Sequence, residues 1–219
     1  MKGLKTVLNK EFKAFAGSDK GVFVVYSVLV LAWSFLFASG DDSMVGGAFW
    51  LVFFSVIVAA NFSNTVFISE RMSGSLEILI TSGLSRGAVL FGKMLFIMVM
   101  TLLIGGACAL IASLWGALLS GYGGRVQFGV FEILLYTGAT FLNAAGSAYF
   151  SVRLSSPRLL HFINLFILGV IITVYTVIAE LFVVSDWVLL ALVIVPGVLF
   201  SFLAHREFSG ERIIQPVIF

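Results

Sequence analysis

The chain contains 219 residues, of which 60% are hydrophobic and 11% are charged, and its formal net charge is +2. A soluble domain of this length could not bury that much apolar surface, so the composition excludes a soluble protein and predicts an integral membrane protein. Because the apolar runs are continuous rather than alternating, they predict an all-α fold built from transmembrane helices.

The first 17 residues predict an amphipathic helix in the membrane interface. Its apolar residues recur at helical spacing, at Leu4, Val7, Leu8, Phe12 and Phe15. Its lysines lie mostly on the other side, at Lys2, Lys5, Lys10 and Lys13. A basic helix of this kind lies in the headgroup plane, held by apolar burial and anionic lipid, and a disordered basic tail is the alternative interpretation. Gly17 would end the helix, and Ser18 or Asp19 could cap the next one.

Six apolar runs are long enough to cross a bilayer, which takes about 20 residues of helix. They cover residues 22–38, 45–68, 88–119, 128–150, 159–184 and 187–204. With the N-terminus inside the cell, every Lys and Arg except Arg125 falls on the cytoplasmic side, in agreement with the positive-inside rule. The sequence therefore predicts six transmembrane helices in one domain over residues 1–219, with both termini in the cytoplasm.

A charged segment with several glycines, residues 70–84, separates the second apolar run from the third. Ser73 or Gly74 could cap a helix over about residues 75–82. With Gly74 as the cap, Glu77 is the third residue of that helix, where its carboxylate could reach back to the free backbone amide and would favour the helix dipole. We call residues 70–84 the coupling segment, for the reason given below.

The remaining positions of the coupling segment fit a short helix at the cytoplasmic membrane surface. Leu76, Leu79 and Ile80 would share one face of this helix. Gly83 would end it, and Ser85 could cap the third transmembrane helix. The pattern is that of an amphipathic helix and not of a flexible loop.

Four short motifs follow one another around this segment: Glu70-Arg71, Gly74-Ser75-Leu76-Glu77, Ser85-Arg86 and Gly92-Lys93. In order and spacing they resemble the connection between the second and third spans in permease subunits of ABC-2 type ATP-binding-cassette transporters. The leader Lys10-Glu11-Phe12-Lys13-Ala14-Phe15, the six spans and the inside termini are also similar to that family. The motif-level resemblance covers about 25 residues, and the architectural one covers most of the chain.

The resemblance implies that residues 70–84 are a coupling helix, which docks on a separate cytoplasmic ATPase and transmits its closure to the spans. The residues that would carry this role are Glu70, Arg71, Gly74, Leu76, Glu77, Leu79, Ile80 and Arg86. It further implies a second permease copy or a homologous permease as partner, and a location in the cytoplasmic (inner) membrane of a bacterium or archaeon. ATP and Mg would bind to the ATPase, while this chain would hold no cofactor and no catalytic site.

Two departures from the family pattern bear on the substrate. Gly83 stands where many relatives have proline, and the connection after the fifth span is too short for the re-entrant hairpin of lipid and polysaccharide exporters. The leader and the coupling segment look most like gliding-motility-associated and copper-enzyme-maturation permeases, and the haem-export permease is of similar length. The substrate stays open. A membrane scaffold that anchors an ATPase without transport is the alternative, and a secondary transporter is disfavoured because the spans lack paired ionisable residues.

Residues 87–93 match most of a phosphate-binding loop, but Met94 stands where Ser or Thr must ligate Mg²⁺. We therefore interpret Gly92 as a site of close helix packing and Lys93 as a residue that reaches the headgroup level. His161 and His205 lack the spacing of a metal site and are interpreted as anchors at the membrane interface.

Polar residues inside the predicted spans either bond between helices or line a transport path. They are Asn61, Asn64, Asn143, Asn164, Thr173 and Thr176. The fourth run is rich in small residues, which predicts close packing of that helix. Glu132 and Glu180 would lie at the outer headgroup level or at the exit of a path.

Overall fold

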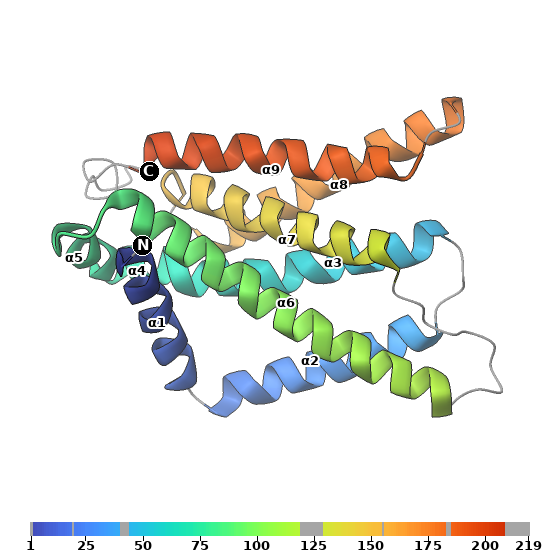
Figure 1. Cartoon of the computed structure of the whole chain (residues 1–219), viewed down its shortest axis with the longest axis horizontal. Helices are drawn as coiled ribbons and strands as arrows, with labels where there is room; N and C mark the ends of the chain where they lie inside the picture. Colours follow the sequence, from blue (N-terminus) through green and yellow to red (C-terminus); the bar gives the residue numbers. More distant parts are fainter. Residues whose placement is uncertain are drawn as a thin grey trace.

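The computed structural model describes residues 2–18, 20–39, 44–118, 129–154, 156–182 and 185–208, and within them it contains helices and no strand. Long helices run side by side along one direction and form a bundle (Figure 1). These are α2 (Lys20–Ser39), α3 (Met44–Ser63), α6 (Arg86–Leu118), α7 (Val130–Ser151), α8 (Pro157–Leu181) and α9 (Trp187–Glu207). The shorter elements are α1 (Lys2–Ala16), the π-helix η1 (Asn64–Ser69), α4 (Glu70–Met72) and α5 (Ser75–Thr81).

Five helical stretches are long and apolar enough to cross a membrane, which makes this chain a multi-pass membrane protein. They are Lys20–Ala38, Val52–Met72, Arg86–Leu118, Arg158–Tyr175 and Trp187–Glu207. The remaining predicted run, residues 128–150, overlaps the 22-residue helix α7 (Val130–Ser151), which is not among these five. Six membrane crossings therefore stay a prediction, whereas the helical fold is confirmed.

Helix α7 is less apolar than its neighbours because it packs against protein on most sides, between α3 and α9. A Cβ atom added to Gly138 would lie 3.3 Å from Ile194 of α9, and one added to Gly146 would lie 3.3 Å from Asn164 of α8. A Cβ on Gly197 of α9 would lie 2.9 Å from the Phe141 ring. The predicted close packing of this helix is confirmed, since small residues let the backbones approach.

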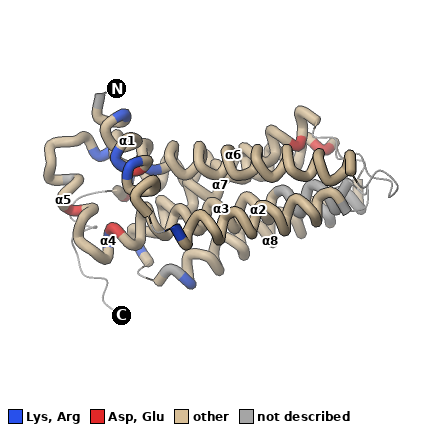
Figure 2. The backbone as a smooth tube through the Cα atoms, turned by 90° about the horizontal axis from the view of Figure 1, so that it is seen from below, with Lys and Arg blue, Asp and Glu red and all other residues tan. Residues whose placement is uncertain are grey.

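Lysine and arginine gather at the end of the bundle that carries α1, α4 and α5 (Figure 2). At this end Arg153, which follows α7, pairs with Glu207 at the end of α9 at 2.5 Å. The observed separation of charge agrees with the sequence pattern that predicts the cytoplasmic side, and the orientation itself stays a prediction. The predicted outer connections around residues 40–43 and 120–125, including Arg125, lie outside the described residues.

The leader is a helix, so the alternative of a disordered tail is wrong. Helix α1 lies at one end of the bundle and is inclined to the long helices (Figure 1). It ends at Gly17 as predicted, where the Gly17 amide donates to the Lys13 carbonyl oxygen at 3.0 Å. The Ser18 hydroxyl donates to the Phe15 carbonyl oxygen at 2.6 Å and so belongs to the end of α1 rather than to a cap on α2.

Candidate functional site

The coupling segment folds as the local signals predict. Gly74 has φ +73° and precedes α5, and Gly83 has φ +80° and follows it, so both adopt a left-handed conformation that costs other residues energy. Ser85 caps α6, because its hydroxyl accepts a hydrogen bond from the Ala88 amide at 3.3 Å. Leu76 is buried and Leu79 packs against the core, whereas the side chain of Ile80 lies outside the described part of the chain.

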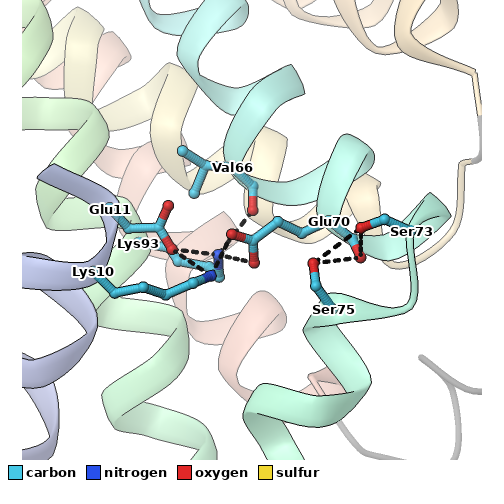
Figure 3. A network of polar contacts seen from close by, with 7 residues as sticks. All are labelled: Lys10, Glu11, Val66, Glu70, Ser73, Ser75 and Lys93. Atoms are coloured by element: carbon cyan, nitrogen blue, oxygen red, sulfur yellow. Dashed lines mark hydrogen bonds and ion pairs between the residues drawn. The ribbon is translucent and has the colours of Figure 1, made fainter. Parts of the chain in front are cut away.

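Two serines hold the turn between α4 and α5. The hydroxyls of Ser73 and Ser75 both donate to the Glu70 carbonyl oxygen, at 3.1 and 3.3 Å, and lie 3.0 Å from each other (Figure 3). Hydroxyl side chains commonly satisfy free carbonyls in this way at turns. The turn is therefore a bonded structure, and α5 begins from a fixed point.

Lys93 is the centre of a buried charge network, which the sequence did not reveal. Its side chain is fully buried within the protein, seven residues after the start of α6, so it does not extend out to the headgroups as a free side chain. The ammonium donates to the Glu11 carboxylate of α1 at 2.7 Å, to the Glu70 carboxylate of α4 at 2.6 Å and to the Val66 carbonyl oxygen of η1 at 2.9 Å (Figure 3). Three elements thus meet at one cation.

The network is balanced in both charge and hydrogen bonding. An ammonium has three donors, and the three acceptors around Lys93 use all of them. Lys10 of α1 pairs with Glu70 and lies 3.5 Å from Glu11, so two lysines face two carboxylates. Partial burial by itself would lower the pKa of Lys10, but hydrogen bonds and charges from both carboxylates hold that pKa above its ordinary value of 10.5. A buried ion is tolerated only under such compensation.

The π-helix η1 supplies the third acceptor. In a regular α-helix the Glu70 amide would donate to the Val66 carbonyl oxygen, but here it donates to Phe67 instead. The Val66 oxygen accepts from Lys93. Short π-helical insertions in α-helices are rare and frequently occur at functional sites. The irregular backbone thus lies directly beside the buried lysine.

Arg71 fastens the other side of the coupling segment. Its guanidinium donates to the Ser151 carbonyl oxygen at 2.7 Å and is 3.4 Å from the Leu154 carbonyl oxygen, both at the C-terminal end of α7. A cation there also interacts favourably with the helix dipole. Glu70 and Arg71, predicted to contact a partner, thus make contacts within the chain that tie α4 to α1, α6 and α7.

The outward surface of the segment is mainly apolar and hydroxylated. Met72 is 70% exposed and Ile78 is 71% exposed, although both lie at the charged end of the bundle. The Glu77 carboxylate accepts no hydrogen bond from the described residues, so its predicted capping bond is wrong. The reason is that the Gly74 amide, its expected donor, already donates to the Arg71 carbonyl oxygen at 3.2 Å. Arg86, at the start of α6, is exposed.

Helix α1 packs tightly on α6 beside the network. Val7 is fully buried, and a Cβ added to Gly92 would lie only 2.9 Å from its side chain. The predicted close packing at Gly92 is therefore confirmed. The rings of Phe12 and Phe96 meet edge to face at 5.1 Å, and Phe15 packs on Phe62 of α3 at 5.5 Å. The apolar face of α1 thus packs against this chain, with Val7 fully buried and Leu8, Phe12 and Phe15 partly buried.

Two of the polar residues predicted inside the spans bond between helices. Asn164 of α8 donates to the Ser147 hydroxyl of α7 at 2.8 Å, and Asn64 of η1 contacts His161 of α8. Three others bond within their own helices: Asn61 to Ile57, Asn143 to Ala139 and Thr173 to Gly169. The side chain of Thr176 lies outside the described residues. These contacts support helix packing and leave a path untested.

We expect Asn164→Ala to lower the free energy of unfolding by about 1 kcal/mol, because hydrogen bonds between membrane helices contribute on that order. Unfolding by denaturant in detergent micelles measures this. Asn61→Ala is the control, since Asn61 is exposed and bonds only to its own helix. An Asn164 variant as stable as the parent would argue against a packing role.

The other candidate residues have simple surroundings. His205 stacks on Phe91 of α6, while His161 bonds to Asn64. The two histidines therefore contact different partners. No group of three or more metal-ligating side chains exists among the described residues. The phosphate-loop match at residues 87–93 is part of the continuous helix α6 and has no loop. Glu132 folds back toward Gly129, and the Glu180 side chain is outside the described part.

Comparison with known proteins adds no assignment. No protein-family model and no curated protein matches this chain. The functional argument therefore depends on the residues and geometry above.

Proposed function

We propose that this chain is the membrane subunit of a transporter of the ABC-2 type, driven by a separate cytoplasmic ATPase that docks on α4 and α5. The observation that carries the proposal is the construction of the coupling segment. It is bonded on one side to α1 and α6 through Lys93 and on the other side to α7 through Arg71. An element fixed in this way transmits a displacement to the bundle, whereas a free loop absorbs it.

The exposed residues of the segment suit a protein partner. Met72 and Ile78 are apolar side chains with 70% and 71% of their surface exposed, at the end of the bundle where charge collects. Exposed apolar groups in a polar setting favour docking into an apolar recess of another protein. The carboxylate of Glu77, a partly exposed residue, would add a polar contact at the edge.

In this proposal ATP and Mg bind to the ATPase, and the chain described here contributes the path together with a second permease copy. The membrane is the cytoplasmic membrane of a bacterium or archaeon, with α1, α4 and α5 on the cytoplasmic side. The concentration of Lys and Arg at that end supports this orientation.

The test is co-purification of this chain with its cognate cytoplasmic ATPase. We expect Ile78→Asp to reduce the amount of ATPase recovered at least tenfold, because a charge would enter an apolar contact, and Glu77→Arg to reduce it less. Arg206→Glu, at an exposed position in the last turn of α9 at the same end, is the control. Equal recovery with Ile78→Asp and with the parent would overturn the docking assignment.

A further inference from the structure

The described lysine side chains of α1, those of Lys5, Lys10 and Lys13, divide between two faces of the helix. Lys10 belongs to the buried network. Lys5 and Lys13 are exposed, and for neither of their side chains does the described chain show an ion pair or hydrogen bond. The only carboxylate of α1, Glu11, is buried against Lys93. The outer face of α1 is therefore basic and has no acidic residue to balance it.

The position of α1 places this basic face at the depth of the lipid headgroups. Phe15, in the last turn of α1, contacts Phe23 of α2 at 5.2 Å and Tyr26 at 6.4 Å. Both belong to the first membrane-spanning stretch, which begins at Lys20. Only residues 17–19 connect α1 to α2, and α1 lies at one end of the bundle, inclined to the long helices (Figure 1). Its exposed lysines thus lie where a bilayer presents its phosphates.

The apolar face of α1 makes its membrane contact unusual. A free amphipathic helix attaches to a bilayer by burying its apolar face in lipid, but here that face packs on α6 and α3. The outer face of α1 can therefore attach to the bilayer only by electrostatic attraction. Each lysine near an anionic surface adds a favourable electrostatic contribution. Such binding depends on lipid composition, because zwitterionic headgroups offer no net charge.

We propose that the outer face of α1 binds the headgroups of anionic phospholipids through Lys5 and Lys13, and that this binding holds the coupling segment in place. The connection is direct, since the neighbouring residues Lys10 and Glu11 pair with Glu70 and Lys93 on the inner face. A lipid that fixes α1 therefore also limits the motion of α4. This inference concerns the isolated chain and does not depend on the ATPase.

The experiment places the purified chain in nanodiscs of phosphatidylcholine alone or mixed with phosphatidylglycerol. We expect phosphatidylglycerol to raise the midpoint of thermal unfolding of the parent by several degrees, and the double variant Lys5→Gln, Lys13→Gln to lose most of this increase. Arg206→Gln removes an exposed cation from α9, and this variant should keep the increase in the unfolding midpoint. Both exposed lysines can be replaced without touching the core, so folding is preserved.

Hydrogen exchange of the peptide that covers residues 70–82 tests the transmission. Phosphatidylglycerol should slow this exchange several-fold in the parent and leave it unchanged in the double variant. The lipid proposal is overturned if the double variant keeps the full thermal increase, or if Arg206→Gln loses as much of it. It is also overturned if the double variant impairs ATPase binding while neither measurement on the isolated chain responds to lipid, because the face would then bind protein. Lipid-independent exchange in the parent would refute the transmission.

Discussion

Replacing Lys93 with methionine should lower the free energy of unfolding by about 3–5 kcal/mol, because removal of one partner from a buried ion pair leaves charge uncompensated. Methionine has a similar length, so the loss does not arise from an empty cavity. Two carboxylates, Glu11 and Glu70, would then face a single lysine, Lys10, and the Val66 carbonyl oxygen would lose its hydrogen bond from Lys93. Denaturant unfolding of the purified protein in neutral detergent measures the change.

A matched control and a compensating variant make this prediction sharp. Lys13→Met is the same substitution at an exposed position of α1 and should change stability by less than about 0.5 kcal/mol. Adding Glu11→Gln to Lys93→Met leaves Lys10 paired with Glu70, so the double variant should regain a substantial part of the loss. Equal stability of Lys93→Met and Lys13→Met would show that the network does not hold the fold.

Gly92→Ala should lower the free energy of unfolding by about 1–3 kcal/mol, the cost typical of adding a group to a well-packed contact. The new methyl group would lie 2.9 Å from the Cβ and Cγ1 atoms of Val7 and 3.4 Å from the Leu4 carbonyl oxygen. A Cβ atom moves only with its backbone, so α1 must shift away from α6. Faster hydrogen exchange in α1, measured with the unfolding midpoint, would report that shift.

Gly106→Ala provides the opposite result in the same helix. Nothing lies within 4 Å of a Cβ atom at Gly106, so the substitution only improves helix propensity, by up to about 1 kcal/mol. The two alanine variants should therefore change stability in opposite directions. If both raise stability, α1 does not depend on close contact at Gly92.

Structural features with local causes were predictable. Continuous apolar runs predicted helices. The left-handed glycines Gly74 and Gly83 mark the two ends of α5 at the positions that the sequence predicted. Ser85 caps α6, and Gly17 ends α1, as the composition of these sites indicated. In each case the physical cause lies within a few residues along the chain, so a sequence pattern can record it.

No local sequence pattern indicated that Lys93 is buried. A lysine seven residues into a membrane helix matches the pattern of a side chain that reaches the headgroups, and only the docking of α1 turns it into a core residue. The partners of the ammonium come from positions 11, 66 and 70, which no local rule connects. The sequence did not predict the π-helix either, since residues 64–69 contain no glycine or proline that would indicate an irregular backbone.

The sequence by itself determined the class of protein, the helices and their ends, the separation of charge and the presence of a helix in the coupling segment. Hydrophobicity, capping and glycine conformation act locally, so these properties follow from neighbouring residues. Only the tertiary structure decided which charged side chains face outward and which are paired with other groups inside the protein. Glu70 and Arg71 lie in a motif that suggests an exposed surface, yet both bond to other helices, and Met72 and Ile78 are the exposed ones. That choice depends on which helices dock beside the segment, because a charge is buried only where partners from elsewhere in the chain surround it.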